Sequence, residues 1–363
     1  MNRFKKILAL LASLALILTL AGCGEKKTEA DPNKPYAGTT LTVFNWYDYI
    51  DESVLKEFTE ETGIEIKYTC FTTNEEMYTQ LAASPSAYDV LIPSDYIIEQ
   101  LIREDMLAEL DTSKMENYSG LLDWIKTPDF DPEGKYSVAY MWGTVGILYN
   151  TTMTGGEIDS WDALFDPKYQ RSVFMMDSVR DTLGAGLAYL GYSMNSTDEK
   201  EMNEAKDVLI QQKKDGLVKA YTVDESKDMM VAGEAALALM WSGDALYAME
   251  KNEDLAYCVP KEGSNIWVDS MCIPKASKNI EAAQLFIDYM CRPDVAYKNQ
   301  QYIYYSTPVA KVADEMYSDE EKENLTLNPT QDIIDRCEYF HDISQYNDLY
   351  THCLLYTSDA ADD

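Results

Sequence analysis

Apolar positions in the first third of the chain follow strand and helix spacings in turn. Residues 41–46 and 89–93 form continuous apolar runs, and residues 64–71 alternate apolar with polar positions, so all three segments predict β-strands. Helical spacing predicts three helices: from Asp51 or Ser53 to Thr62 with Gly63 closing the end, from a cap at Asn74, and from Tyr96 to Arg103. Strands and helices that alternate in this order predict a parallel sheet covered by helices.

The later part of the chain continues this pattern without an internal sequence repeat. Apolar runs at 171–177, 235–241, 254–260 and 265–274 predict further strands. Helical spacing predicts helices over 181–189, 202–213 and 280–290. The fold class is therefore expected to be α/β throughout. About 340 residues follow the N-terminal apolar segment, which is enough for two units with cores of their own.

The N-terminal residues predict export and lipid attachment. Basic residues at positions 3, 5 and 6 precede the apolar run 7–20, and Leu20-Ala21-Gly22-Cys23 follows. A basic start, a short apolar segment and small residues indicate a secretory signal over 1–22. The tetrapeptide resembles a bacterial lipobox, which makes Cys23 the lipidated first residue of the mature chain. An ordinary signal peptide and a single membrane anchor are the alternatives.

Both ends of the mature chain differ in character from the folded part. Residues 24–38 are polar with two prolines, so residues 23–38 are expected to tether the anchored Cys23 to the first strand. The protein is then extracytoplasmic and lipid-anchored to the cell membrane, in a periplasmic space or on the outer face. Residues 351–363 break the preceding pattern, and we interpret them as a truncated or foreign C-terminus, with a natural acidic tail as the alternative.

The charge balance excludes several classes of partner. The chain has 30 lysine and arginine residues against 63 aspartate and glutamate residues, and the signal segment removes three basic residues, which leaves a net charge of −36. Such a charge argues against nucleic acid and against anionic lipid surfaces, and it attracts cations. The six cysteines beyond Cys23 form no C-x-x-C pair, and the only histidines are His341 and His352. A zinc site is therefore not expected, and the cysteines are interpreted mostly as small buried side chains.

Aromatic and acidic residues recur where predicted strands end. In open α/β sheets, ligands bind beyond the carboxyl ends of strands, at the point where neighbouring strands send their chains opposite ways. If the strand order is 2-1-3, the ends of the strands 41–46 and 89–93 adjoin there. The candidate ligand-binding residues near strand ends are Trp46, Tyr49, Ser94, Tyr96, Asp181, Trp241, Trp267, Asp269 and Tyr305.

These residue types together suit an alkyl ammonium ligand. Aromatic faces attract ammonium groups, and carboxylates accept charge-assisted hydrogen bonds from them. Each residue alone has a structural alternative, because a tryptophan is more often part of a core and an aspartate after a strand is more often a helix cap. We find neither a nucleophile–base pair nor a phosphate loop, so a binding protein without catalysis or cofactor is favoured. The alternatives are a binder of sugar, thiamine, amino acid or iron, and a hydrolase that uses paired carboxylates.

Eight separated motifs carry a family resemblance. They are FNWYDYIDESVLKEFTEETG (44–63), YDVLIPSDYIIEQL (88–101), VAYMWGTVGILYN (138–150), SWDALFDPKY (160–169), DSVRDTLGAGLAYLGYSMN (177–195), ALMWSGD (238–244), IWVDSMCIPK (266–275) and YSTPV (305–309). In order and spacing they closely resemble the bacterial spermidine/putrescine-binding proteins of ABC importers, over about residues 39–345. The resemblance implies a two-lobed, periplasmic-binding-protein-like fold of type II, with the ligand in the cleft between the lobes.

The resemblance also implies a division of the chain. Residues 39–143 with about 272–306 are expected to form lobe 1, and residues 144–271 with about 307–350 to form lobe 2. The segments near 140–146 and 268–274 are expected to cross between the lobes and to hinge. The expected partners are a small polyamine, a transporter permease and the membrane through the lipid anchor, with no nucleic acid, and the protein is expected to be a monomer.

Individual site residues are carried over from the family by position. Trp46, Tyr49, Trp241, Trp267 and Tyr305 match aromatic residues that line the family's cleft, and Ser94 and Tyr96 match the pair after the third strand. Asp181 matches an acidic residue that binds an amine, and Asp269 matches the central carboxylate. The chain departs from the family at three places: Tyr47 replaces a smaller residue, Ser178 replaces a second aspartate of spermidine-binding members, and Phe340 falls where a glutamine contacts ligand. These departures leave the exact polyamine open.

Overall fold

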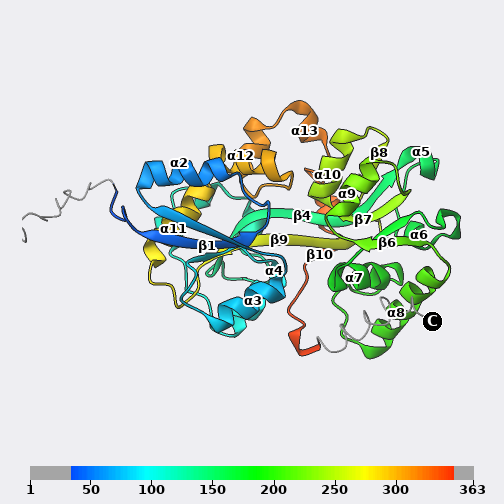
Figure 1. The fold of residues 1–363 in the computed structure, drawn as a ribbon, viewed down its shortest axis with the longest axis horizontal. Coiled ribbons are helices and arrows are strands. Elements are labelled where there is room, and N and C mark those ends of the chain that lie inside the picture. Colours follow the sequence, from blue (N-terminus) through cyan, green and yellow to red (C-terminus); the bar gives the residue numbers. More distant parts are fainter. Residues whose placement is uncertain (1–33, 347–363) are drawn as a thin grey trace, which may run out of the picture.

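The computed structural model describes residues 34–346 (Figure 1). The predicted signal segment 1–22, the lipidation site Cys23, most of the predicted tether and the tail 351–363 lie outside the described residues. The described part forms one ten-stranded mixed sheet with helices on its faces, which agrees with the predicted α/β class. No helix within residues 34–346 combines the length and the apolar character needed to cross a membrane.

The first three strand–helix units form as predicted. The strands are β1 (Thr40–Trp46), β2 (Glu65–Phe71) and β3 (Val90–Leu91), and the helices are α2 (Glu52–Thr62), α3 (Asn74–Ala83) and α4 (Asp95–Arg103). The strands are parallel and lie in the order β2-β1-β3, so the order on which the site prediction depended is confirmed. This order places the carboxyl ends of β1 and β3 side by side.

The predicted ends of α2 are correct. The side chain of Asp51 accepts a hydrogen bond from the Ser53 amide at 2.9 Å, which satisfies one of the free donors of the first turn. Gly63 closes the helix with φ of 73°, a left-handed conformation that glycine adopts without a steric penalty.

The predicted cap at Asn74 is wrong by one residue. Thr73 caps α3, because its hydroxyl accepts from the Glu76 amide at 3.0 Å. The Asn74 side chain instead points across to α4, where its Oδ1 accepts from the Ser94 amide at 3.2 Å and its Nδ2 donates to the Tyr96 hydroxyl at 3.0 Å. Asn74 therefore fixes the two predicted site residues that follow β3.

Two long antiparallel strands form the middle of the sheet. β4 (Ser137–Asn150) pairs with β9 (Ser264–Cys272), and every residue of both strands is buried. β9 also pairs with β3 on one side, while β4 pairs with β7 (Leu237–Trp241) and β8 (Leu255–Cys258). Figure 1 shows β4 and β9 side by side, running from the elements near β1 to those near β7. The segments 140–146 and 268–274, predicted to cross between lobes, fall largely in these strands.

The far end of the sheet is built from β5 (Val173–Met176), β6 (Val218–Thr222) and β7. Its helices are α5 (Thr151–Thr154), α6 (Asp162–Phe165), α7 (Val179–Tyr189), α8 (Glu199–Lys214), α9 (Glu225–Val231) and α10 (Ser242–Lys251). The helix predicted from Asp181 begins two residues earlier, because the Ser178 hydroxyl caps α7. The strand predicted over 254–260 is shorter, since Pro260 cannot donate to a ladder.

Beyond β9 the chain first returns to the β1 end of the sheet, and it then runs back to the first residues of β9. Its elements are α11 (Ile280–Met290), α12 (Pro293–Ile303), a π-helical turn (Val312–Met316), α13 (Asp319–Glu323), α14 (Gln331–Ile334) and β10 (Cys337–Glu338). Phe286 of α11 packs edge-on against Phe58 of α2, with ring centroids 5.1 Å apart. The ring of Tyr317, after the π-helical turn, has its centroid 6.3 Å from that of Tyr297 of α12. The strand β10 pairs with β9. The exact division into lobes stays a prediction.

Cysteine burial partly follows the expectation. Cys272 and Cys291 are buried, whereas Cys70, Cys258 and Cys337 are half-buried, and all five are free thiols. Cys353 lies outside the described residues.

Candidate ligand-binding site

Asp269 of β9 is the residue on which two other predicted site residues converge. The Tyr49 hydroxyl, three residues beyond β1, donates to Asp269 Oδ2 at 2.8 Å. Ser94, the residue before α4, forms an isolated antiparallel bridge with Asp269, and its side chain helps to lower the pKa of the Asp269 carboxyl. The sheet order therefore brings the ends of β1 and β3 to one carboxylate in the neighbouring strand, as the strand-end argument predicts.

The Asp269 carboxylate is buried and incompletely paired. Its residue is only 6% exposed, and burial raises its pKa to about 6, although hydrogen bonds from Ser94 and Tyr49 oppose this shift. The Oδ1 atom is buried and has no hydrogen-bond partner within residues 34–346. An unpaired buried acceptor is costly, so this atom is suited to a donor that the ligand brings.

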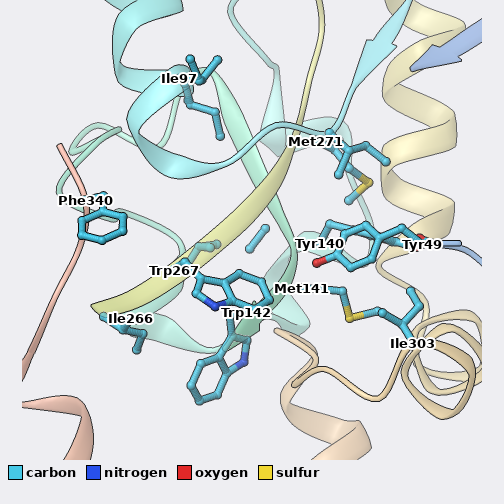
Figure 2. Packing of buried hydrophobic residues seen from close by; sticks show 14 of the residues in the cluster. Tyr49, Ile97, Tyr140, Met141, Trp142, Ile266, Trp267, Met271, Ile303 and Phe340 are labelled. Atoms are coloured by element: carbon cyan, nitrogen blue, oxygen red, sulfur yellow. The ribbon is translucent and has the colours of Figure 1, made fainter. Parts of the chain in front are cut away.

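Aromatic rings form a wall beside this carboxylate, which we call the aromatic wall: Tyr49, Trp267 and Tyr305. Tyr305 packs edge-on against Trp267 with centroids 4.8 Å apart, and against Tyr49 at 5.9 Å. Tyr49 also packs edge-on against Tyr140 at 5.5 Å, and Figure 2 shows this pair beside Trp267, close to β9. The Trp267 indole nitrogen is buried without a hydrogen-bond partner in the described part of the chain.

Two glycines let the polypeptide approach this wall closely. A Cβ on Gly143 of β4 would lie 2.6 Å from a Trp267 ring carbon, and a Cβ on Gly243 of α10 would lie 2.3 Å from a Tyr305 ring carbon. Both distances are far below van der Waals contact, so any side chain at these positions would displace a ring of the wall. The backbones of β4 and α10 therefore pack directly against two rings of the aromatic wall.

Trp46 ends β1 but belongs to a neighbouring contact group. Its ring lies 4.6 Å from Phe71 of β2, at an interplanar angle of 57°, and its indole nitrogen has no partner among the described residues. The Trp46 carbonyl accepts from the Tyr68 hydroxyl at 3.4 Å. The ring is half-buried, which leaves part of its face available to a ligand.

Asp181 and Trp241 form a second group at the far end of the sheet. Asp181 lies in the first turn of α7, is 6% exposed, and accepts from the Ser178 hydroxyl at 2.5 Å. Burial raises the pKa of Asp181, whereas the Ser178 hydroxyl, the charge of Arg180 and the Trp241 side chain lower it. Ser178, which replaces an expected aspartate, thus acts as a neutral partner of the carboxylate that remains.

Tyr96 faces a cation that the chain itself supplies. The Arg180 guanidinium of α7 lies 5.5 Å from the Tyr96 ring and 4.2 Å from the Phe340 ring. Arg180 also donates to the His341 carbonyl at 3.0 Å and to Asn195 Oδ1 at 3.0 Å. The predicted site residue Tyr96 and the departure Phe340 therefore hold an arginine between α4 and α7, rather than joining the contacts around Asp269.

Two carboxylates near the site, one buried and one half-buried, were absent from the predicted set. Asp95 is 1% exposed, and it accepts from its neighbour's amide (Tyr96, 2.7 Å) and from the Val268 amide at 3.4 Å. The pKa of Asp95 is raised to about 8. Burial is the main cause and the charge of Asp269 adds to it, whereas the hydrogen bond from the Tyr96 amide acts in the opposite direction. Asp244 of α10 accepts from the Tyr305 hydroxyl at 3.0 Å. Both follow a predicted strand end by a few residues, which was the available signal.

The arrangement favours recognition of a cation. Carboxylates at the site accept from hydroxyl and amide donors, and flat rings lie beside them. No cluster of three or more potential metal ligands occurs in the part of the chain that the structure describes. A buried carboxylate with a free oxygen beside aromatic faces can accept hydrogen bonds from an ammonium and stabilise its charge.

Fold and site together define a solute-binding protein. The family model for bacterial extracellular solute-binding proteins matches residues 53–329. The chain belongs to this family, which places it outside the cytoplasm as the N-terminal sequence predicts, and the predicted two-lobed periplasmic-binding-protein-like fold is confirmed.

Particular relatives narrow the comparison. The chain is 34% identical to the spermidine/putrescine-binding periplasmic protein of Escherichia coli, over 94% of this chain and 95% of that protein. It is 30% identical to the putrescine-binding periplasmic protein SpuD of Pseudomonas aeruginosa, over 94% of this chain and 95% of the relative. The solved structure of the spermidine/putrescine ABC transporter substrate-binding protein PotD from Streptococcus pneumoniae is 38% identical, covers 88% of this chain and 99% of its own, and superposes with a TM-score of 0.78. The resemblance in the motifs is confirmed.

Proposed function

We propose that this protein captures a polyamine, putrescine or spermidine, between its lobes and delivers it to the permease of an ABC importer. The observation that carries the proposal is the buried Asp269 carboxylate, whose Oδ1 is without a partner in the described residues while aromatic rings lie beside it. A neutral solute would leave the charge of this carboxylate uncompensated in a buried place, whereas an ammonium pairs with it. The names of the relatives support the same ligand class.

The remaining parts of the proposal follow from sequence and chemistry. Lipidation at Cys23 would hold the protein at the membrane, and residues 23–38 would tether the lobes within reach of the permease. We also propose that the protein acts as a monomer and without a cofactor. Among the described residues the site offers acceptors and rings, which suit binding rather than catalysis. Asp269, Tyr49, Ser94 and the aromatic wall hold one ammonium, and Asp181 with Trp241 is placed to hold the other end of the ligand.

Calorimetric titration against a panel of solutes tests the ligand class. We expect putrescine or spermidine to bind at micromolar concentration or tighter, because a desolvated ion pair and cation–π contacts act together. A neutral sugar, thiamine and a zwitterionic amino acid serve as comparison ligands. Absence of both heat and a melting shift with every polyamine, together with tight binding of a neutral sugar, would refute the proposal.

Closure of the two lobes around the ligand is the second expectation. A ligand held from both ends of the sheet binds the closed form better than the open one, and this differential affinity drives closure. Saturating polyamine is therefore expected to reduce the radius of gyration in small-angle X-ray scattering. An unchanged radius at saturation would show that the ligand is held within one lobe.

A further inference from the structure

Asp244 is a carboxylate that reaches the aromatic wall but is already paired with a lysine. Its Oδ2 accepts from the Tyr305 hydroxyl at 3.0 Å, and its Oδ1 accepts from the Lys227 ammonium of α9 at 3.2 Å. The side chain of Asp244 is 18% exposed and that of Lys227 is 29% exposed. This ion pair is therefore largely removed from solvent, and it touches the ring that packs on Trp267 and Tyr49.

Lys227 reproduces within the protein the chemistry expected of the ligand. Its ammonium, at the end of a methylene chain, lies against a carboxylate and 5.5 Å from the centre of the Tyr247 ring. Burial lowers the pKa of Lys227, but Asp244 outweighs this effect and the pKa is raised, so the group is charged at neutral pH. An ammonium from a ligand would meet Asp244 in the same way if the lysine were absent.

We propose that Lys227 is a specificity-determining residue: its ammonium occupies Asp244, and the site therefore selects diamines over cations that carry a third ammonium. The inference rests on the proposed polyamine-binding function. Asp269 differs from Asp244 because the Tyr49 hydroxyl that donates to it is neutral, which leaves its charge available to a ligand. Charge balance decides the selection, since a third ammonium without a carboxylate partner loses its hydration with no compensation.

Replacement of Lys227 by methionine keeps most of the length of the side chain and removes its charge. The third carboxylate then becomes available, and one new charge-assisted hydrogen bond corresponds to about a tenfold gain in affinity. We expect Lys227→Met to raise the affinity for spermidine relative to putrescine by about that factor. The dissociation constants of both ligands, measured by calorimetry on the purified protein, give this ratio directly.

Lys219→Met is the matched control. Lys219 of β6 also pairs with a carboxylate, that of Glu234 at 3.2 Å, and also lies 5.5 Å from a ring, that of Phe174, but neither partner belongs to the aromatic wall. This variant is expected to leave the spermidine to putrescine ratio unchanged. The double variant Lys227→Met with Asp244→Asn should lose the gain, because the carboxylate that accepts the third ammonium is gone.

The outcomes separate the inference from the function on which it rests. An unchanged ratio in folded Lys227→Met protein, or an equal loss of both ligands, would overturn the role of Lys227 and leave polyamine binding standing. Failure of the unmodified protein to bind either polyamine would overturn the proposed function itself. If the methionine variant does not fold, Lys227→Gln also removes the charge and keeps a polar end. The ratio of the spermidine and putrescine affinities of that variant then tests the role of Lys227.

Discussion

Replacing Asp269 with asparagine is expected to weaken polyamine binding by more than tenfold. The substitution keeps the shape of the side chain but removes the charge that a buried ammonium needs, and the loss of one partner of a desolvated pair costs about 2–5 kcal/mol. The Tyr49 hydroxyl can still donate to the amide oxygen, so the aromatic wall should keep its arrangement. Calorimetric titration with putrescine and spermidine gives the change in affinity.

The pH dependence distinguishes a charge role from a packing role. Burial raises the pKa of Asp269 to about 6, and ammonium binding requires its ionised form. The affinity of the unmodified protein should therefore fall as the pH drops below about 6, by up to about tenfold for each further pH unit, whereas Asp269→Asn should lose the part of this dependence that Asp269 contributes. An unchanged dissociation constant in the variant would remove Asp269 from the site.

A buried carboxylate outside the site provides the control for Asp269. Asp131 is 2% exposed and accepts hydrogen bonds from the amides of Lys135, Tyr136 and Ser137 and from the Ser137 hydroxyl. Asp131→Asn is expected to lower the melting temperature, because an amide nitrogen cannot accept these bonds, while the protein that remains folded binds with unchanged affinity.

Replacing Trp267 with leucine is expected to weaken binding by roughly tenfold to a hundredfold. The indole supplies a ring face to the ammonium, worth about 0.5–2 kcal/mol, and its removal also leaves Tyr305 without the edge-on contact at 4.8 Å. An aromatic pair adds about 0.5–1.5 kcal/mol beyond area burial, so part of the loss comes from a less ordered wall. The dissociation constant and the melting temperature should be measured together.

Trp124 gives the same substitution away from the site. It is half-buried and packs edge-on against Trp142, with ring centroids 5.1 Å apart. Trp124→Leu should reduce stability through the lost ring contact without a change in affinity. Equal affinities for the Trp267 variant and the unmodified protein would show that the indole is only part of the core, which is the structural alternative for any single tryptophan.

Electrostatics at the site and over the whole molecule act in the same direction. The full chain carries a formal net charge of −33, which attracts cationic solutes to its surface. At and beside the site, however, Asp244 and the Tyr96–Phe340 pair each hold a cation of the chain itself. The selectivity of the site therefore depends on which carboxylates remain for the ligand rather than on the total charge.

Local sequence chemistry determined much of the first third of the fold. Apolar spacing predicted β1 to α4 because neighbouring residues decide helix and strand periodicity, and Asp51 and Gly63 predicted the ends of α2 through their own side-chain and backbone properties. Position after a strand end predicted Tyr49 and Ser94, given the order β2-β1-β3 that the sheet has. Asp269 instead lies inside β9, so the family motif rather than a strand end indicated this carboxylate. Family motifs then indicated the kind of ligand.

Partners of individual side chains were decided only by the tertiary structure. The sequence predicts Asn74 as a helix cap. Its side chain instead forms hydrogen bonds with Ser94 and Tyr96, because α3 and α4 lie against each other in the fold. The same holds for Lys227, which lies 17 positions before Asp244 and meets it through the packing of α9 on α10. A sequence predicts which residues reach the edge of a sheet, since that depends on local geometry. Charge pairing depends on distances between separate elements, so the packed chain alone determined that Asp269 keeps a free oxygen while Asp244 does not.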